Sequence, residues 1–308
     1  MIRGATACAA FALASAAAGA AHSAQVFRSG TDTVLLSVTV ADAKNRPVAG
    51  LRQADFLVFE DKAPQTISVF ASDPQPIALS LLLDSSLSME RTLVLAQQAA
   101  IGFIERLGPH DVAQVIDFNS TSDTRIRQAF TGDRQALEQA IRQIRAGGWT
   151  ALYDALYVGL AEANRLRPRL SEAIRRQAVI VLSDGANTQS LKTSDDVMDS
   201  AKRSDVMVYA IALRDKANAR PTGFSESDYV LRSLSQVTGG RAFVADDPTQ
   251  LPAIYHQIAD ELAHQYSIGY ISRNPRRDGG WRQVAVQLQD PSLVARTRAG
   301  YFGPAKGR

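Results

Sequence analysis

The sequence predicts a doubly wound α/β domain inserted into a small β-sandwich domain. Between residues 76 and 264, apolar runs bounded by turns alternate with amphipathic stretches at helical spacing. This alternation is typical of a parallel sheet covered by helices on both faces. Residues 25–75 and 265–308 instead contain short apolar runs with no helix between them, a pattern that favours antiparallel strands.

The central region, residues 76–264, contains apolar runs that predict strands at 77–83, 112–118, 178–182, 206–213 and 241–244. The amphipathic stretches between them predict helices at 92–107, 134–145, 152–166, 194–204, 229–238 and 251–263. Gly239-Gly240 directly follows the fifth helix and indicates its end, because glycine tolerates the left-handed conformation that terminates helices. These elements suffice for a complete doubly wound domain.

The two flanks are predicted to contribute strands at 33–40, 56–60, 67–70, 266–271, 283–288 and 294–301. Neither flank has enough strands to close a core alone. We therefore expect residues 25–75 and 265–308 to form one sandwich, in which Tyr266, Tyr270 and Tyr301 pack. The ends of the inserted domain must then lie close together, as the doubly wound class permits.

Residues 1–24 are predicted to be a secretory signal peptide. Arg3 precedes an alanine-rich stretch from residue 5 to residue 21, and small residues follow. Cleavage after Ala20 and cleavage after Ala24 both stay open. The alternatives are a membrane anchor, which this short and weakly apolar span disfavours, and lipidation at Cys8, which has only seven residues before it. We expect an exported protein, periplasmic or secreted.

Composition excludes several classes of protein. With 45% hydrophobic and 21% charged residues, the chain is not disordered, collagen-like or a coiled coil. The formal net charge of +3 is too small for a dedicated nucleic-acid surface. The single cysteine lies in the predicted signal peptide, so the mature fold depends on its core, and no apolar run after residue 25 is long enough to span a membrane.

Oxygen-bearing side chains occur where predicted strands end and helices begin. Asp84, Ser86 and Ser88 follow the first central strand, Asp184 follows the third, and Thr150 precedes a helix. The carboxyl ends of parallel strands share one edge of a sheet, where such domains bind ligands. We therefore expect these five side chains to converge on that edge.

An all-oxygen set of two carboxylates and three hydroxyls suits a hard divalent cation such as Mg²⁺, with Mn²⁺ or Ca²⁺ as alternatives, and does not suit zinc or copper. Mg²⁺ keeps some of its waters in proteins. A coordination position therefore stays free for an acidic group from outside.

The pattern Asp84-x-Ser86-x-Ser88 with Thr150 and Asp184 resembles the metal-ion-dependent adhesion site of von Willebrand factor type A domains. The resemblance covers about residues 76 to 264. It implies a Rossmann-like domain in which Ser86, Ser88 and Thr150 contact the metal directly. By the same resemblance, Asp84 and Asp184 act directly or through water, and a ligand Asp or Glu completes the coordination.

A looser resemblance extends to the flanks. The segments 48–51 and 300–302, with Asp55-Phe56, Glu60-Asp61 and Gly269-Tyr270, are similar to those of bacterial exported proteins in which such a domain is embedded between β flanks. This second resemblance implies nothing specific about the ligand.

Simpler roles compete for the same side chains. Asp84, Ser86 and Ser88 could cap a helix N-terminus, and Asp154 is interpreted as an acidic residue in the first turn of its helix. Asp117 and Asn119 end a strand and are not assigned to the site. His256 and His264 lie eight residues apart, too far for the one-turn pair that binds zinc.

The expected function is a non-enzymatic, metal-dependent module that binds a protein ligand through its Asp or Glu. The alternatives are a metal-independent structural scaffold and a serine hydrolase with Ser86 as nucleophile. The hydrolase lacks the glycine-flanked elbow and a histidine that obviously reaches the site. Phosphate-binding and dinucleotide-binding glycine loops are also missing from the sequence.

Overall fold

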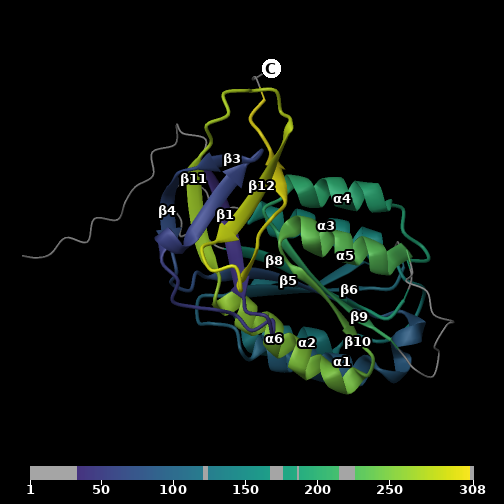
Figure 1. Ribbon diagram of the computed structural model, residues 1–308. Coiled ribbons are helices and arrows are strands. Elements are labelled where there is room, and N and C mark those ends of the chain that lie inside the picture. Colours follow the sequence, from purple (N-terminus) through teal and green to yellow (C-terminus); the bar gives the residue numbers. More distant parts are fainter. Residues whose placement is uncertain (1–32, 121–123, 167–175, 186, 215–225, 306–308) are drawn as a thin grey trace, which may run out of the picture.

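The structure is a computed structural model that describes residues 33–120, 124–166, 176–185, 187–214 and 226–305. The predicted signal peptide, residues 1–24, lies outside the described residues. Within these ranges, no helix combines the length and the apolar character needed to cross a membrane. The described chain forms an α/β layer structure joined to a smaller region of β-strands (Figure 1).

The central sheet contains all five predicted strands. They are β5 (Ile77–Asp84), β6 (Val112–Phe118), β8 (Arg176–Ser183), β9 (Met207–Leu213) and β10 (Arg241–Ala245). A sixth strand, β7 (Arg125–Thr131), runs antiparallel at one edge, giving the order β10-β9-β8-β5-β6-β7. The prediction of a purely parallel sheet is therefore wrong at this edge. None of the β7 side chains is buried, so no apolar run marks the strand in the sequence.

The six predicted helices are confirmed, with ends that differ by a few residues. α1 (Leu93–Ile104), α2 (Arg134–Arg142) and α6 (Leu251–Ala263) cover one face of the sheet, and α3 (Leu152–Arg165), α4 (Ser194–Arg203) and α5 (Glu226–Thr238) cover the other (Figure 1). A separate cluster of buried apolar side chains fills each layer. Local signals set the helix starts: the Asp133 side chain accepts hydrogen bonds from two N–H groups at the start of α2, and Thr193 forms a capping box with Asp196 at the start of α4.

The remaining strands form two four-stranded sheets, each built from both ends of the chain. One has the order β13-β1-β11-β4 and the other β14-β12-β2-β3. Their bounds are β1 (Thr33–Ala41), β2 (Phe56–Glu60), β3 (Ala63–Gln65), β4 (Ile67–Ala71), β11 (Tyr266–Ile271), β12 (Trp281–Leu288), β13 (Val294–Arg296) and β14 (Gly300–Phe302). Side chains from both sheets share one buried cluster, which includes Val38, Phe56, Tyr266 and Val284.

One predicted strand of the flanks is wrong. Residues 294–301 divide into β13 and β14, which belong to different sheets. The chain leaves the first sheet between them, where the Ala299 N–H donates a hydrogen bond to the Val237 carbonyl in α5 at 2.9 Å. This contact with a helix that is distant in the sequence interrupts the strand. No local feature of the sequence predicts the contact.

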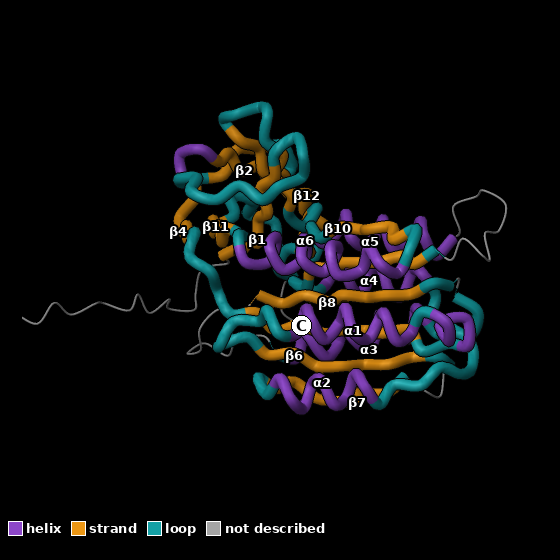
Figure 2. The backbone as a smooth tube through the Cα atoms, turned by 90° about the horizontal axis from the view of Figure 1, so that it is seen from below, coloured by secondary structure: helices purple, strands orange, loops and turns teal. Residues whose placement is uncertain are grey.

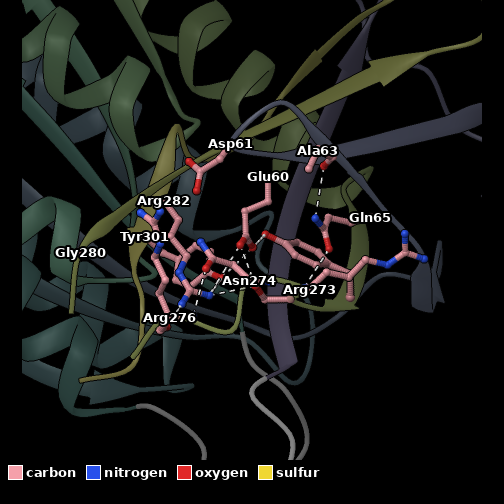
Figure 3. A network of polar contacts seen from close by, with 12 residues as sticks. Glu60, Asp61, Ala63, Gln65, Arg273, Asn274, Arg276, Gly280, Arg282 and Tyr301 are labelled. Carbon is pink, nitrogen blue, oxygen red and sulfur yellow. Dashed lines mark hydrogen bonds and ion pairs between the residues drawn. The ribbon is translucent and has the colours of Figure 1, made fainter. Parts of the chain in front are cut away.

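A buried carboxylate lies in the β region. Glu60 Oε2 accepts hydrogen bonds from the Tyr270 and Tyr301 hydroxyls at 2.9 and 2.8 Å, and Oε1 accepts one from the Ser272 hydroxyl at 2.6 Å. The Arg282 guanidinium lies 3.6 Å from Oε1 (Figure 3). The expected packing of Tyr266, Tyr270 and Tyr301 in this region is confirmed, and two of these tyrosines also hold the carboxylate in place.

The β region meets the α/β layers at the amino ends of the parallel strands. Arg176, the first residue of β8, donates hydrogen bonds to the Leu262 and Gln265 carbonyls, where α6 leads into β11. Glu261 of α6 lies between Arg241 at 3.0 Å and Arg296 of β13 at 2.6 Å. The carboxyl ends of the strands therefore lie at the opposite end of the sheet from the β region (Figures 1 and 2).

Candidate metal site

Asp84 is the last residue of β5, and its side chain is fully buried. Oδ1 accepts a hydrogen bond from the Ser86 N–H at 2.8 Å, and Oδ2 accepts one from the Ser183 hydroxyl at the end of β8, at 2.5 Å. Burial raises the pKa of the Asp84 carboxyl to about 6, and the nearby charge of Asp184 contributes. A buried carboxylate at a strand end is therefore held in place at a cost in desolvation.

Ser86, Ser88 and Asp184 continue this polar chain toward the surface. The Ser86 and Ser88 hydroxyl oxygens lie 3.0 Å apart, and the Ser88 hydroxyl donates to Asp184 Oδ1 at 2.8 Å. Ser86 is buried, Asp184 is partly exposed and Ser88 is exposed. Ser86 occupies the N-cap position of a short 3-10 helix, yet its side chain makes no capping hydrogen bond. The capping alternative is therefore wrong for Ser86.

Thr150 is buried in the loop before α3 and is tied to the loop that follows β8. Its N–H donates to the Thr188 hydroxyl at 3.0 Å, and its carbonyl accepts from the Thr188 N–H at 2.9 Å. Within the described ranges, no hydrogen bond joins the Thr150 hydroxyl to the other four predicted residues. Its place is defined by Gly185: a Cβ built on that residue would lie 3.3 Å from Thr150 Oγ1 and 3.9 Å from Ser88 Oγ. The two hydroxyls thus flank one small space that a glycine leaves open.

Replacing Gly185 with alanine should weaken metal binding about tenfold, because the added methyl group enters the space between the two hydroxyls. Stability of the metal-free protein should change little, since the backbone at this glycine is not left-handed. Titration calorimetry with Mg²⁺ measures the affinity. Gly147→Ala is the matched control, because a Cβ there meets no atom within 4 Å, and a wild-type affinity in Gly185→Ala would show that this space plays no part in metal binding.

The other acidic residues near this edge have structural partners. Asp154 lies in the first turn of α3, as expected, and accepts hydrogen bonds from the Leu191 and Lys192 N–H groups at 3.0 and 2.8 Å. Asp117 makes a two-pronged ion pair with Arg127 of β7 at 2.6 and 2.9 Å. These two carboxylates fix the loop after β8 and the edge of the sheet beside the site.

The two histidines weighed in the sequence, His256 and His264, contact residues outside this cluster. His256 Nε2 lies 2.9 Å from Arg106 Nη1, and His264 Nδ1 lies 2.8 Å from the Asp260 carbonyl. In the part of the chain that the structure describes, no histidine forms a hydrogen bond with Ser86, whose hydroxyl instead contacts Ser88. The contact that would activate a serine nucleophile is therefore not seen there.

The chemistry of this cluster fits a hard divalent cation. The described residues contain no group of three or more His, Cys, Asp or Glu side chains that could hold a metal, so an ion here would rely on hydroxyls beside two carboxylates. Such oxygen donors suit Mg²⁺, Mn²⁺ or Ca²⁺. A cation would also offset the two negative charges, one of them buried, that Asp84 and Asp184 place close together.

The α/β layers, with polar side chains at the carboxyl ends of β5 and β8, define a Rossmann-like α/β domain. The sequence pattern of the von Willebrand factor type A domain matches residues 79–257. This match spans more than half of the chain, and the chain belongs to that family.

Comparison with individual proteins agrees with this assignment. The chain is 32% identical over 113 residues to the uncharacterized protein sll0103 of Synechocystis and 23% identical over 222 residues to a UPF0353 protein of Nocardia farcinica. These matches span 36% and 63% of this chain but only 26% and 65% of the relatives, less than two thirds of either.

A solved structure described as von Willebrand factor type A from Catenulispora acidiphila has a TM-score of 0.52 at 13% identity. The match covers 90% of this chain and 76% of the Catenulispora acidiphila chain. At this identity the likeness concerns the fold alone, and its extent shows that it includes strands outside residues 79–257.

Proposed function

We propose that this protein is an exported, metal-dependent protein-binding module that captures a partner's Asp or Glu through a divalent cation held by Asp84, Ser86, Ser88, Thr150 and Asp184. Mg²⁺ is the proposed ion, with Mn²⁺ or Ca²⁺ as alternatives. The proposal assigns the chain a binding role and no enzymatic one. The von Willebrand factor type A domain would be inserted into a β-sandwich formed by the two flanks.

One observation carries the proposal. A continuous set of hydrogen bonds links buried Asp84 to Asp184: the Ser86 N–H contacts the Asp84 carboxylate, and the Ser86, Ser88 and Asp184 side chains follow in turn. Thr150 lies against the same glycine, Gly185, as Ser88. The set joins three loops that are far apart in the sequence. A cation bound there would supply positive charge and a free coordination position to an otherwise acidic cluster.

The position of the cluster supports capture of an external ligand. It lies at the carboxyl ends of the strands, away from the β region, so the described residues of the flanks, 33–75 and 265–305, do not cover it (Figures 1 and 2). Ser88 is exposed and Asp184 is partly exposed, which leaves the outer part of the cluster open to a partner. A partner's carboxylate would be repelled by Asp84 and Asp184 unless a cation lies between them.

Adding Mg²⁺ to the metal-free protein should raise its melting temperature by several degrees. A ligand present at 100 times its dissociation constant stabilises the folded state by about 2.7 kcal/mol. Differential scanning calorimetry after exhaustive EDTA treatment measures the shift, which excess EDTA should reverse. An unchanged melting temperature with Mg²⁺, Mn²⁺ and Ca²⁺ would contradict the proposal and favour a metal-independent scaffold.

A further inference from the structure

Two large apolar side chains stand exposed beside the candidate metal site. Leu87 is 62% exposed and lies between Ser86 and Ser88, and Trp149 is 67% exposed and directly precedes Thr150. Each is therefore the immediate neighbour of a hydroxyl residue of the site. Single exposed apolar residues are common on proteins, but a tryptophan this exposed is unusual.

The backbone holds these two positions side by side. The Leu87 N–H donates a hydrogen bond to the Gly148 carbonyl at 3.2 Å, and the Gly147 N–H donates one to the Ser85 carbonyl at 2.8 Å. The loop after β5 and the loop before α3 are thus joined directly next to the two side chains. We call Leu87 and Trp149 the apolar rim.

We propose that the apolar rim is part of the ligand-binding surface, and that the partner is a protein segment carrying an Asp or Glu within one or two residues of a bulky aliphatic or aromatic side chain. The inference rests on the proposed function and specifies its partner. The carboxylate of the segment would reach the cation, and the neighbouring apolar side chain would cover Leu87 and Trp149.

The proposed binding surface combines the cation site with the apolar rim, and this combination favours a segment that carries both an acidic and an apolar side chain. A carboxylate that meets a hydrated cation only exchanges one set of polar contacts for another, so it provides little affinity alone. Burying a tryptophan and a leucine adds a hydrophobic contribution, and tryptophan is among the residues that most often dominate binding energy. An aliphatic neighbour beside the indole favours an apolar side chain over a hydroxylated sugar ring.

Selection from displayed random dodecapeptides tests the inference. The full chain is immobilised in millimolar Mg²⁺, and bound peptides are eluted with EDTA, sequenced and synthesised. We expect the eluted peptides to carry an acidic residue next to a bulky apolar one. Trp149→Ala should weaken their binding about tenfold or more and Leu87→Ala severalfold, while both variants keep the wild-type metal-induced shift in melting temperature.

Val294→Ala is the control, because Val294 is 57% exposed but lies on β13 in the β region. It should bind the peptides as the wild type does. Tryptophan fluorescence gives a direct readout: the chain has two tryptophans, so Trp281→Phe leaves Trp149 as the reporter, and its emission should shift to the blue on peptide binding.

The remaining outcomes separate the two proposals. EDTA-eluted peptides that carry acidic residues without apolar neighbours, and that bind Trp149→Ala as tightly as the wild type, would overturn the role of the rim but leave the metal-dependent function standing. Peptides that stay bound in EDTA, or a selection that enriches nothing, would count against both.

Discussion

Replacing Asp84 with asparagine should stabilise the metal-free protein by about 1–2 kcal/mol at neutral pH. The buried carboxyl has its pKa raised from 3.8 to about 6, which corresponds to a cost of at most about 3 kcal/mol for keeping it charged. Asparagine carries no charge and can keep both contacts: its oxygen can accept from the Ser86 N–H, and its amide can donate to the Ser183 hydroxyl. Urea denaturation in EDTA measures the gain.

The Asp84 carboxyl should make the metal-free protein less stable as the pH rises. The Asp84 carboxyl has a higher pKa in the folded than in the unfolded protein, so its charge lowers stability above pH 6. This cost disappears as the pH falls from about 6 toward about 4. The metal-free wild type should therefore gain stability relative to Asp84→Asn over that interval, and the difference between the two proteins should be largest at neutral pH.

The same substitution should nearly abolish the response to Mg²⁺. Asp84 supplies one of only two carboxylates in the cluster, and losing that charge should weaken metal binding about 100-fold. At the same Mg²⁺ concentration, about 100 times the wild-type dissociation constant, the remaining stabilisation would be only about 0.4 kcal/mol, so the melting temperature of Asp84→Asn should differ little between Mg²⁺ and EDTA. Higher intrinsic stability together with a largely lost metal response is the signature of a carboxylate kept for binding.

Asp154→Asn is the matched control. Asp154 is another buried aspartate near the site, but both of its oxygens accept backbone N–H groups. Asparagine cannot accept both, so this variant should lose about 1 kcal/mol of stability and keep the metal response. If Asp84→Asn behaves like Asp154→Asn, then Asp84 has a structural role and the assignment of the site is wrong.

The sequence could predict that the candidate site residues lie near one another, because strand ends fix where they lie. Asp84, Ser86 and Ser88 follow one apolar strand so closely that no packing detail is needed to place them together. The partner of Asp84 could not be found in this way. Ser183 reaches it because β5 and β8 pair with Leu83 opposite Leu182, which sets Asp84 beside Ser183, and this register depends on the packing of the whole sheet.

The edge strand of the sheet is a second feature that the sequence does not predict. The buried strands can be predicted because each is an apolar run in the sequence. β7 has only partly or fully exposed side chains, so it has no such run. Its ion pair between Arg127 and Asp117 depends on antiparallel pairing with β6. The sequence alone therefore favours a surface position for the Asp117 carboxylate. In the structure this carboxylate pairs with Arg127 and holds β7, the strand that borders the candidate site.

The second large effect is expected in the β region, where Glu60→Ala should lower the free energy of unfolding by about 3–5 kcal/mol. Glu60 and Arg282 are both buried, and removing the carboxylate leaves the guanidinium charge without its counter-ion. The hydroxyls of Tyr270, Tyr301 and Ser272 lose their acceptor at the same time. Urea denaturation of the full chain measures the loss.

Replacing both charged partners separates the ion pair from the packing. In Glu60→Leu with Arg282→Met no charge is left buried, so the double variant should be more stable than Glu60→Ala. A double variant that is as unstable as the sum of its single substitutions would show that the two charges are not coupled, and that the tyrosine contacts account for the loss.

Glu60→Ala should nevertheless keep the metal response. The β region joins the α/β layers at the amino ends of the strands, and the candidate metal site lies at their carboxyl ends (Figure 2). At a temperature where Glu60→Ala is still folded, Mg²⁺ should bind with wild-type affinity in titration calorimetry. A weakened affinity in this variant would mean that the flanks shape the metal site across the sheet, which the contacts at the amino ends alone do not explain.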